Sequence, residues 1–307
     1  MWSVPYLEAI ATSLSRRTGY ESNQLPMALF HYTSLPGVIG IGSSMVIRAT
    51  CIADLADTSE LSFGAAIVRQ ECRKKIDRGI DKFARMVVEL IPDLLLDRAG
   101  WTFITCFCPD TQSNHHWETF GAFGLRIETL GDWIPDLKPE TMSAQVRYHK
   151  VLYQEAAQRR CVRETLDVAC NGFGKAGSSA DSPWAPSTAR FFARNISQLL
   201  MGVVSSFKQP QFRAEKEWRI ICGPNPELRN SDPGASDGWF RSLIKGPESR
   251  RYVELCKTAY HLKNGRGARQ MPFNAIHCSR TAKSDTVQIE PIRDMLSASG
   301  CAGISII

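Results

Sequence analysis

The chain has 307 residues, 43% of them hydrophobic, and a formal net charge of +6 at pH 7. These residues can build a large core, and no stretch approaches the roughly 20 apolar residues needed to span a bilayer. We therefore expect no membrane partner. The mild surplus of 37 basic over 31 acidic residues permits a polyanionic partner without requiring one.

Ten cysteines are spread along the chain, several inside apolar runs where Cys behaves as a small hydrophobe. Their spacing is not that of a small secreted scaffold, and the first twenty residues do not read as a signal peptide. We expect a reduced, cytoplasmic protein.

The predicted elements alternate without a regular βαβ rhythm. A polar, partly helical lead-in covers 1–27. Strands are predicted at 28–34, 45–50, 101–107, 123–129, 146–153, about 218–222, 251–256, 275–279 and 287–292. Helices are predicted over 58–96 with a break near 77–79, over 154–170 and over about 187–206. The segment 35–44 is expected to contain one helical turn, and the loops 171–187 and 223–239 are candidate docking or substrate segments.

This intermixing predicts an α+β fold rather than a doubly wound sheet. The sequence contains no G-x-G-x-x-G and no P-loop, which argues against a Rossmann or nucleotide-hydrolase site. We expect one elaborated domain over 1–307, with a motif core at 28–225 and strands within 250–292 that complete the sheet.

The first candidate for catalysis is an acid pair, Glu215 and Glu217, at the start of the apolar run at 218–222. Side chains two apart on a strand share a face, so both carboxylates are expected to enter one pocket from a strand edge. Two carboxylates in a cleft suit glycosidic chemistry, whose transition state resembles an oxocarbenium ion. A solvated strand entrance is the alternative.

The second candidate is His31 in "LFHYTS", at the end of a predicted strand beside Tyr32 and Thr33. A histidine among hydroxyl groups suits the recognition of sugar hydroxyls, whereas a lone strand-end histidine is more often structural. In "HHWETFG", Trp117 could form an aromatic wall near a ligand, or pack in the core.

A zinc site is the third possibility, because Cys106, Cys108, His115 and His116 are all of ligand type. In structural zinc sites two to four residues separate the two cysteines of a pair, whereas only one residue, Phe107, separates Cys106 from Cys108. We expect no metal.

Taken in order, "LFHYTSLPGVIGI", "ADTSEL", "TCF…HHWETFG…GLRI" and "FKQPQFRAEKEWRII" resemble a widespread bacterial domain family of unknown function. That family reads approximately as YHYTS, ND-x-x-E, W-x-x-[YF]-[AG] and F-x-x-E-x-E-W-R. The resemblance covers about residues 28–225. The chain departs from the pattern where Ala56 replaces the usual Asn before Asp57.

The same pattern looks like the ADP-ribosyltransferase superfamily, particularly its nucleic-acid-modifying toxins. This resemblance implies a split β-sheet core with helical insertions and NAD as a substrate, without a metal. His31 and Thr33 match the motif that holds the NAD ribose and nicotinamide amide, and His31 would donate to the ribose. Glu217 matches the catalytic glutamate, and Glu215 would orient or deprotonate the acceptor.

The remaining NAD contacts are expected from aromatic and basic side chains. Tyr32 or Trp117 would lie against the nicotinamide, and Arg48 is a candidate for the NAD phosphates. The resemblance alone suggests a toxin or phage-defence setting, in which a neutralising antitoxin is a possible partner.

Basic residues near the proposed site favour RNA, or single-stranded DNA, as the acceptor. They are Lys208, Arg213, Lys216 and Arg219, with further groups at Arg159-Arg160-Arg163, Arg250-Arg251 and Lys263-Arg266-Arg269. Aromatic residues that could stack on bases are Trp184, Phe191, Phe192, Phe207 and Phe212. Three alternatives stay open: a protein side chain as acceptor, a non-catalytic binding module of a defence or toxin–antitoxin assembly, and a metal-dependent nuclease.

Overall fold

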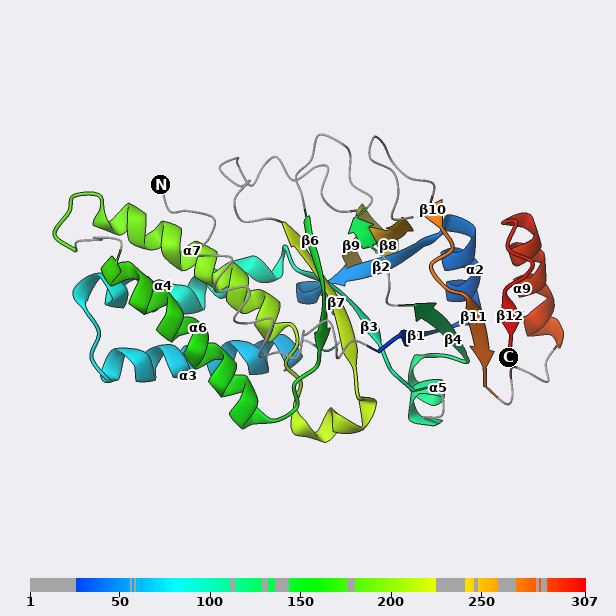
Figure 1. Cartoon of the computed structure of the whole chain (residues 1–307), viewed down its shortest axis with the longest axis horizontal. Helices are drawn as coiled ribbons and strands as arrows, with labels where there is room; N and C mark the ends of the chain where they lie inside the picture. The colour runs from blue at the N-terminus through cyan, green and yellow to red at the C-terminus, as the bar shows by residue number, and fades with distance from the viewer. Residues whose placement is uncertain are drawn as a thin grey trace.

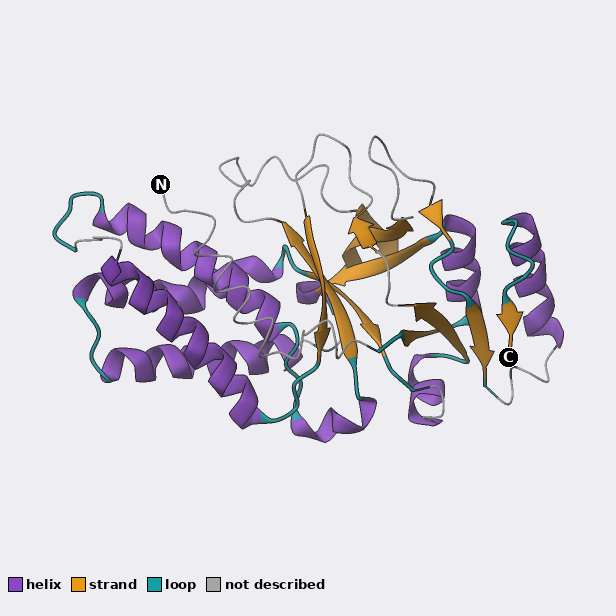
Figure 2. Cartoon of the chain, viewed as in Figure 1, coloured by secondary structure: helices purple, strands orange, loops and turns teal. Residues whose placement is uncertain are grey.

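The computed structural model combines a helical bundle, a large central sheet and a smaller sheet covered by two helices (Figure 1). The four long helices lie together at one end of the longest axis, and the strands lie at the centre and toward the other end, where shorter helices accompany them (Figure 2). The model describes residues 26–55, 57, 59–110, 114–128, 132–135, 144–175, 180–224, 241–245, 248–258, 269–279, 282 and 286–307. The predicted α+β class is confirmed.

The larger sheet is antiparallel and runs in the order β10-β9-β2-β3-β7-β6. Its strands are β2 (Val46–Cys51), β3 (Phe103–Phe107), β6 (Ala144–Lys150), β7 (Trp218–Pro224), β9 (Glu248–Thr258) and β10 (Arg269–Gln270), while β5 (Asp132–Pro135) and β8 (Arg241–Lys245) pair with β9. In the β3–β7 ladder, Cys106 lies opposite Arg219. This register matters for the site because it fixes where the Arg219 side chain starts.

The smaller sheet runs in the order β1-β4-β11-β12. Its strands are β1 (Ala28–Thr33), β4 (Phe123–Glu128), β11 (Ala275–Cys278) and β12 (Ser305–Ile306), and the helices α2 (Leu35–Ser44) and α9 (Thr286–Ala298) lie at this end of the molecule (Figure 1). Phe30 of β1 and Cys108, just after β3, exchange two backbone hydrogen bonds of 2.8 and 2.9 Å. Among the described residues this bridge is the backbone pairing that joins the two sheets.

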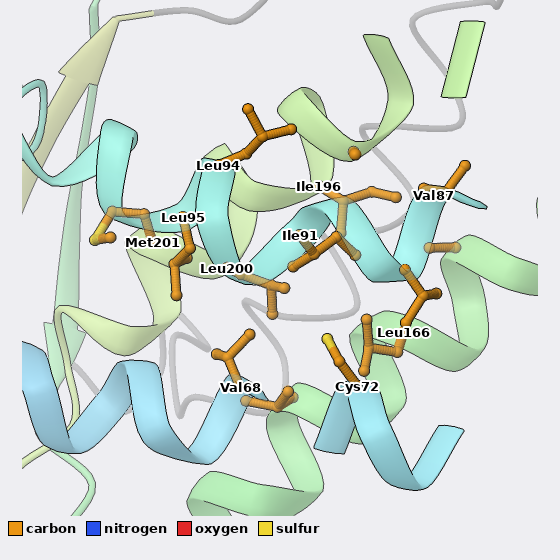
Figure 3. Packing of buried hydrophobic residues seen from close by; sticks show 14 of the residues in the cluster. Val68, Cys72, Val87, Ile91, Leu94, Leu95, Leu166, Ile196, Leu200 and Met201 are labelled. Carbon is orange, nitrogen blue, oxygen red and sulfur yellow. The ribbon is translucent and has the colours of Figure 1, made fainter. Parts of the chain in front are cut away.

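The helical bundle consists of α3 (Ser59–Asp77), α4 (Lys82–Ala99), α6 (Glu155–Lys175) and α7 (Ala185–Val204). Asp81 caps α4 by accepting a hydrogen bond from Ala84 N. Apolar side chains of all four helices interdigitate in one core (Figure 3), including Val68, Ile91, Leu166 and Leu200. Each such burial contributes about 1.5–3 kcal/mol. The core thereby fixes the start of α3 and the end of α7, which border the site described below.

Short helical segments complete the chain around the two sheets. They are η2 (Ile52–Asp54) after β2, α5 (Asn114–Phe120) before β4, and η3 (Pro210–Glu215) before β7. None of the helices in the described part of the chain is long and apolar enough to cross a membrane.

Most predicted elements are present, with ends that differ by a few residues, but three predictions are wrong. The segment 287–292 lies in α9 rather than in a strand, because the apolar residues Ile289, Ile292 and Met295 follow a helical spacing and form its buried face. Between 171 and 187, α6 continues to 175 and α7 begins at 185, so the loop is shorter than expected. Likewise, 35–44 is a full helix rather than one turn.

The strands expected within 250–292 are divided between the sheets, because β9 belongs to the larger sheet and β11 to the smaller one. The lead-in at 1–25, residues 176–179 and residues 225–239 lie outside the described residues.

Candidate active site

A cavity of about 330 Å³ lies where the two sheets meet. Its walls come from β1, β2, β3, α5, η3, β7 and the first turn of α3. Ligand sites in proteins typically occupy about 300–1,000 Å³. The volume suits a planar ring with an attached sugar.

One wall of the cavity is a buried ion-pair network of three carboxylates and two cations. Glu60, Lys208, Glu215, Glu217 and Arg219 all line the cavity, and each is less than 10% exposed. Lys208 Nζ contacts Glu215 Oε2, Glu217 Oε2 at 3.1 Å and Glu60 Oε1 at 3.2 Å. Arg219 lies 2.8 Å from Glu217 Oε1 through Nε and 2.7 Å from Glu60 Oε2 through Nη2. The network keeps buried charges paired, as buried charges must be.

The backbone around Glu217 explains why its side chain enters this wall. Lys216 adopts a left-handed conformation (φ 48°) that ends η3, and Glu217 N then donates to Tyr153 Oη at 2.9 Å. Arg219 follows two residues later in β7 and is held by Ser205 O, which accepts from its Nη1 at 2.7 Å. Glu217 and Arg219 therefore project to the same face and meet as a bidentate pair.

The two carboxyl groups of the acid pair differ in their tendency to ionise. Burial alone would raise the pKa of Glu217, but Arg219 and Lys208 outweigh it and lower the pKa from 4.5 to about 2. Burial raises the pKa of Glu215, and the contact with Lys208 offsets only part of this effect. Glu217 is thus a permanent anion at neutral pH, whereas Glu215 is the better proton acceptor of the pair.

His31 lies across the cavity on β1 and is anchored to the neighbouring sheet. Its Nδ1 is 3.0 Å from Cys106 O, and because a carbonyl oxygen can only accept, Nδ1 carries the hydrogen. Burial lowers the pKa of His31, opposed in part by this hydrogen bond. The neutral ring then presents the Nε2 lone pair, so His31 would accept from a sugar hydroxyl rather than donate to it, contrary to our expectation.

Tyr32 lines the cavity, whereas Trp117 packs against Tyr32 and does not reach the cavity. The Tyr32 hydroxyl donates to Asp110 O at 2.7 Å, and its ring stacks on His116 with centroids 5.1 Å apart. Trp117 meets the Tyr32 ring edge-on at 4.7 Å and is not part of the cavity wall. Of the two aromatic residues expected to contact the nicotinamide, only Tyr32 lies in the cavity wall, and Trp117 packs against its ring.

Of the other two residues predicted to contact the ligand, Arg48 lines the cavity and Thr33 does not. Arg48 lines the cavity with its guanidinium 4.6 Å from the Tyr252 ring centroid and its Nε 3.9 Å from Glu254 Oε1. Its side chain is half exposed and can reach an anionic group. Thr33 does not line the cavity, because its side chain packs against Gly37 in the first turn of α2.

Glu215 reaches the cavity by a different route from the one expected. It is the last residue of the 3₁₀ segment η3, not a strand residue, and the turn at Lys216 redirects the chain before Glu217. Both carboxylates nevertheless line the same cavity.

Many basic residues considered for nucleic acid are engaged within the protein. Lys208 and Arg219 belong to the buried network, Arg251 forms a bidentate pair with Asp54, and Arg159 bonds to Glu71. Arg213 and Lys216 remain exposed beside the site, and Lys263 and Arg266 lie outside the described residues. Of the aromatic residues, Phe192 and Phe207 are buried in the bundle core, whereas Trp184 and Phe191 are exposed.

Within the described residues, no group of three or more His, Cys, Asp or Glu side chains could hold a metal ion. Cys106 and Cys108 both line the cavity, yet burial raises the pKa of each thiol, followed in effect by the charge of Glu217. Both sulfurs are therefore protonated at neutral pH.

Glu60, Cys106 and His116 complete the site and were not selected from the sequence. Glu60 ends the "DTSE" run that matches the ND-x-x-E motif, so the motif carried a signal for it. Cys106 forms a side-chain hydrogen bond with Glu217. His116 was considered only as a zinc ligand, and nothing in its local pattern distinguishes it from His115.

Comparison with models of protein families, with curated proteins and with solved structures finds no significant match to this chain.

Proposed function

We propose that this protein is an NAD-dependent ADP-ribosyltransferase that transfers ADP-ribose to nucleic acid, with RNA favoured over single-stranded DNA, and releases nicotinamide. The observation that carries the proposal is that the ionised Glu217 and the neutral His31 line the same cavity. A split β-sheet core of the ADP-ribosyltransferase type is part of the same proposal, supported by two sheets that join at the Phe30–Cys108 bridge.

The charge on Glu217 suits the breaking of the bond between nicotinamide and ribose. As nicotinamide leaves, positive charge develops on the ribose, and a fixed anion nearby lowers the energy of that state. A pKa of about 2 keeps Glu217 ionised throughout the physiological range. A carboxylate this acidic is a poor general base, so its contribution is electrostatic.

A ribose hydroxyl needs a free position on the Glu217 carboxylate. Arg219 and Lys208 occupy three hydrogen-bonding positions, and the Cys106 thiol provides a fourth donor. The thiol is the weakest of these donors, because S–H is a weak hydrogen-bond donor. We expect the ribose hydroxyl to replace Cys106 at Glu217, while His31 Nε2 accepts from the same sugar.

Glu215 is the group suited to the acceptor. Its raised pKa favours uptake of a proton from an attacking N–H or O–H group. The reaction then balances: the acceptor forms a bond to the ribose carbon, nicotinamide leaves with the electron pair of the broken bond, and the acceptor proton passes to Glu215 and on to water. Exposed Arg213 and Lys216, which flank Glu215 in the chain, support a phosphate-bearing acceptor.

A non-catalytic binding module is the second candidate, and the saturation of Glu217 favours it. Every hydrogen-bonding position of that carboxylate is engaged, as in a network that only stabilises the fold. In this reading the protein would bind a partner, such as an antitoxin or another member of a defence assembly, without consuming NAD.

The test is to incubate the purified protein with labelled NAD and one acceptor pool at a time: RNA, single-stranded DNA or cell protein. We expect label on the RNA pool and its loss in Glu217→Gln. Label on the protein pool alone would replace the acceptor in the proposal. If no pool is labelled and NAD does not change the melting temperature, the transferase proposal fails and the binding module is favoured.

A further inference from the structure

His116 is a buried histidine at the aromatic end of the cavity. It lies on α5, is 2% exposed and stacks on Tyr32 with an interplanar angle of 26°. Phe120, one turn later on α5, packs against its ring with centroids 5.8 Å apart and also lines the cavity. The proposed chemistry assigns no role to this side chain.

One ring nitrogen of His116 lies near the backbone of Glu215, which acts on its pKa as a hydrogen-bond partner. This contact is too poor in distance or angle to satisfy the nitrogen, so both ring nitrogens are left without a good hydrogen bond among the residues that the structure describes. A neutral imidazole carries one N–H donor and one lone pair, and buried polar groups in native proteins are nearly always paired. The adjacent His115 differs, because it is exposed and its Nδ1 lies 3.4 Å from Thr119 Oγ1. An unpaired polar ring in a cavity wall indicates a ligand group that completes it.

The electrostatic surroundings of His116 favour an uncharged ligand group. Burial lowers the pKa of His116, and the nearby backbone of Glu215 only partly offsets this effect. The ring is therefore neutral at pH 7 and can exchange hydrogen bonds with the N–H and N groups of a heterocycle. Tyr32 and Phe120 pack against the His116 ring and also line the cavity, and such aromatic groups suit stacking with bases.

We infer that His116 recognises the nucleobase of the acceptor by hydrogen bonding through a ring nitrogen, and so selects which base is modified. This inference rests on the proposed transferase function. The His116 ring lies near the backbone of Glu215, whose carboxyl group lines the same cavity and is suited to take the acceptor proton, whereas the proposed ribose contacts are at His31 and Glu217. A base held by His116 would present its reacting nitrogen beside Glu215.

In the reaction, the lone pair of the base nitrogen forms the new bond to the ribose carbon. The bond from that carbon to nicotinamide breaks, and its electron pair leaves with nicotinamide. The N–H proton of the base moves to the Glu215 carboxylate and then to water. His116 changes neither protonation nor covalent state, so it is a specificity residue.

The test compares His116→Phe with the matched control His115→Phe on the same helix. Phe keeps the ring that stacks on Tyr32 but removes both nitrogens. With labelled NAD and single-stranded RNA oligonucleotides of one base each, we expect His116→Phe to reduce transfer to the preferred oligonucleotide about tenfold, the value of one hydrogen bond. All activities of His115→Phe should be unchanged, and in His116→Phe nicotinamide release without RNA should fall much less than transfer to the oligonucleotide does.

The inference is overturned if His116→Phe transfers as well as wild type, or if it loses nicotinamide release and transfer in parallel. A second variant, His116→Asn, restores a donor and an acceptor and should recover part of the transfer rate. If His116→Phe does not fold, His116→Asn decides the matter: altered preference among the four oligonucleotides supports the inference, and unaltered preference refutes it.

Binding of the same labelled oligonucleotides without NAD separates this inference from the proposed function. If wild type shows no reaction with NAD but binds one oligonucleotide, and His116→Phe weakens that binding about tenfold, base recognition stands while the transferase fails. If wild type neither binds nor modifies any oligonucleotide, base recognition by His116 is refuted.

Discussion

Replacing Lys208 with Met should destabilise the protein in a way that depends on pH. Met keeps the length of the side chain but removes the positive charge that contacts Glu60, Glu215 and Glu217. Glu60 and Glu217 retain Arg219, whereas Glu215 loses the ion-pair partner that it has among the described residues. The variant therefore leaves one buried carboxylate without a countercharge.

The cost has an upper limit, because an unpaired carboxylate can take up a proton instead of remaining charged. An unfolded glutamate has a pKa of 4.5, so protonation costs about 1.4 kcal/mol for each pH unit above it, or roughly 3.4 kcal/mol at pH 7. In the wild type, burial already raises the pKa of Glu215, so part of this cost is already present. We expect Lys208→Met to lose about 2–3 kcal/mol of unfolding free energy at pH 7.

The sign of the pH dependence follows from the raised pKa. A carboxyl group whose folded pKa exceeds its unfolded value destabilises the folded state progressively as pH rises above the unfolded value. The charge-dependent deficit of Lys208→Met should therefore be small near pH 4.5 and grow toward pH 7. Urea unfolding at pH 5, 6 and 7 measures it, with the exposed Lys216→Met as the matched control. The double variant Lys208→Met/Glu215→Gln should lose the pH dependence.

A deficit of equal size at pH 5 and pH 7, or one whose pH dependence survives in the double variant, would refute this reasoning. Either result would mean that Lys208 acts through the packing of its aliphatic chain and not through its charge.

Three further predictions follow from other contacts. Glu215 must be ionised to accept a proton, so the transfer rate should rise with pH through a pKa above 4.5. In Glu215→Gln this rise in rate should be absent. A wild-type rate that stays constant from pH 5 to 8 would contradict this role. Burial and, after it, the charge of Glu217 raise the pKa of Cys106 well above its ordinary value, so iodoacetamide should alkylate this thiol in the cavity wall more slowly at pH 8 than a free cysteine. Glu217→Gln should accelerate the reaction. Mass spectrometry that shows the rate of a free thiol in wild type would contradict this prediction. Gly121 has φ 126° and an added Cβ would lie 2.4 Å from Thr33 O, so Gly121→Ala should lower the unfolding free energy by about 2 kcal/mol or more. In α2, an added Cβ at Gly40 would have no atom within 4 Å, so Gly40→Ala should raise the unfolding free energy by roughly 0.5–1 kcal/mol. Equal effects of the two variants in urea unfolding would exclude the contact with Thr33 as the cause.

Local patterns were sufficient to predict most elements of the fold. The β-branched and aromatic run of β3 and the three- and four-residue spacing in α3 and α4 each report their own structure directly. The segment 287–292 was predicted as a strand because its six residues alternate in character. The helical spacing that Ile289 and Ile292 begin becomes evident only when Met295 and Leu296 are included.

The residues of the site that belong to a sequence motif could be predicted. The residues that only tertiary packing brings to the site could not. His31, Glu215 and Glu217 line one cavity, as the sequence motifs suggested. Lys208 and Arg219 were read as surface cations, since a short-range pattern cannot reveal that three carboxylates from separate segments surround them. Thr33 and Trp117 fell outside the cavity wall because the packing of α2 and α5 sets their directions.

The release of nicotinamide from NAD by the purified protein tests the central claim most directly. We predict release by wild type, loss of at least about tenfold in Glu217→Gln, where one fixed anion is removed, and no change in Glu118→Gln, an exposed glutamate on α5. Release that is undiminished in Glu217→Gln, or that wild type does not show with any of the RNA, DNA and protein pools present, would contradict the account.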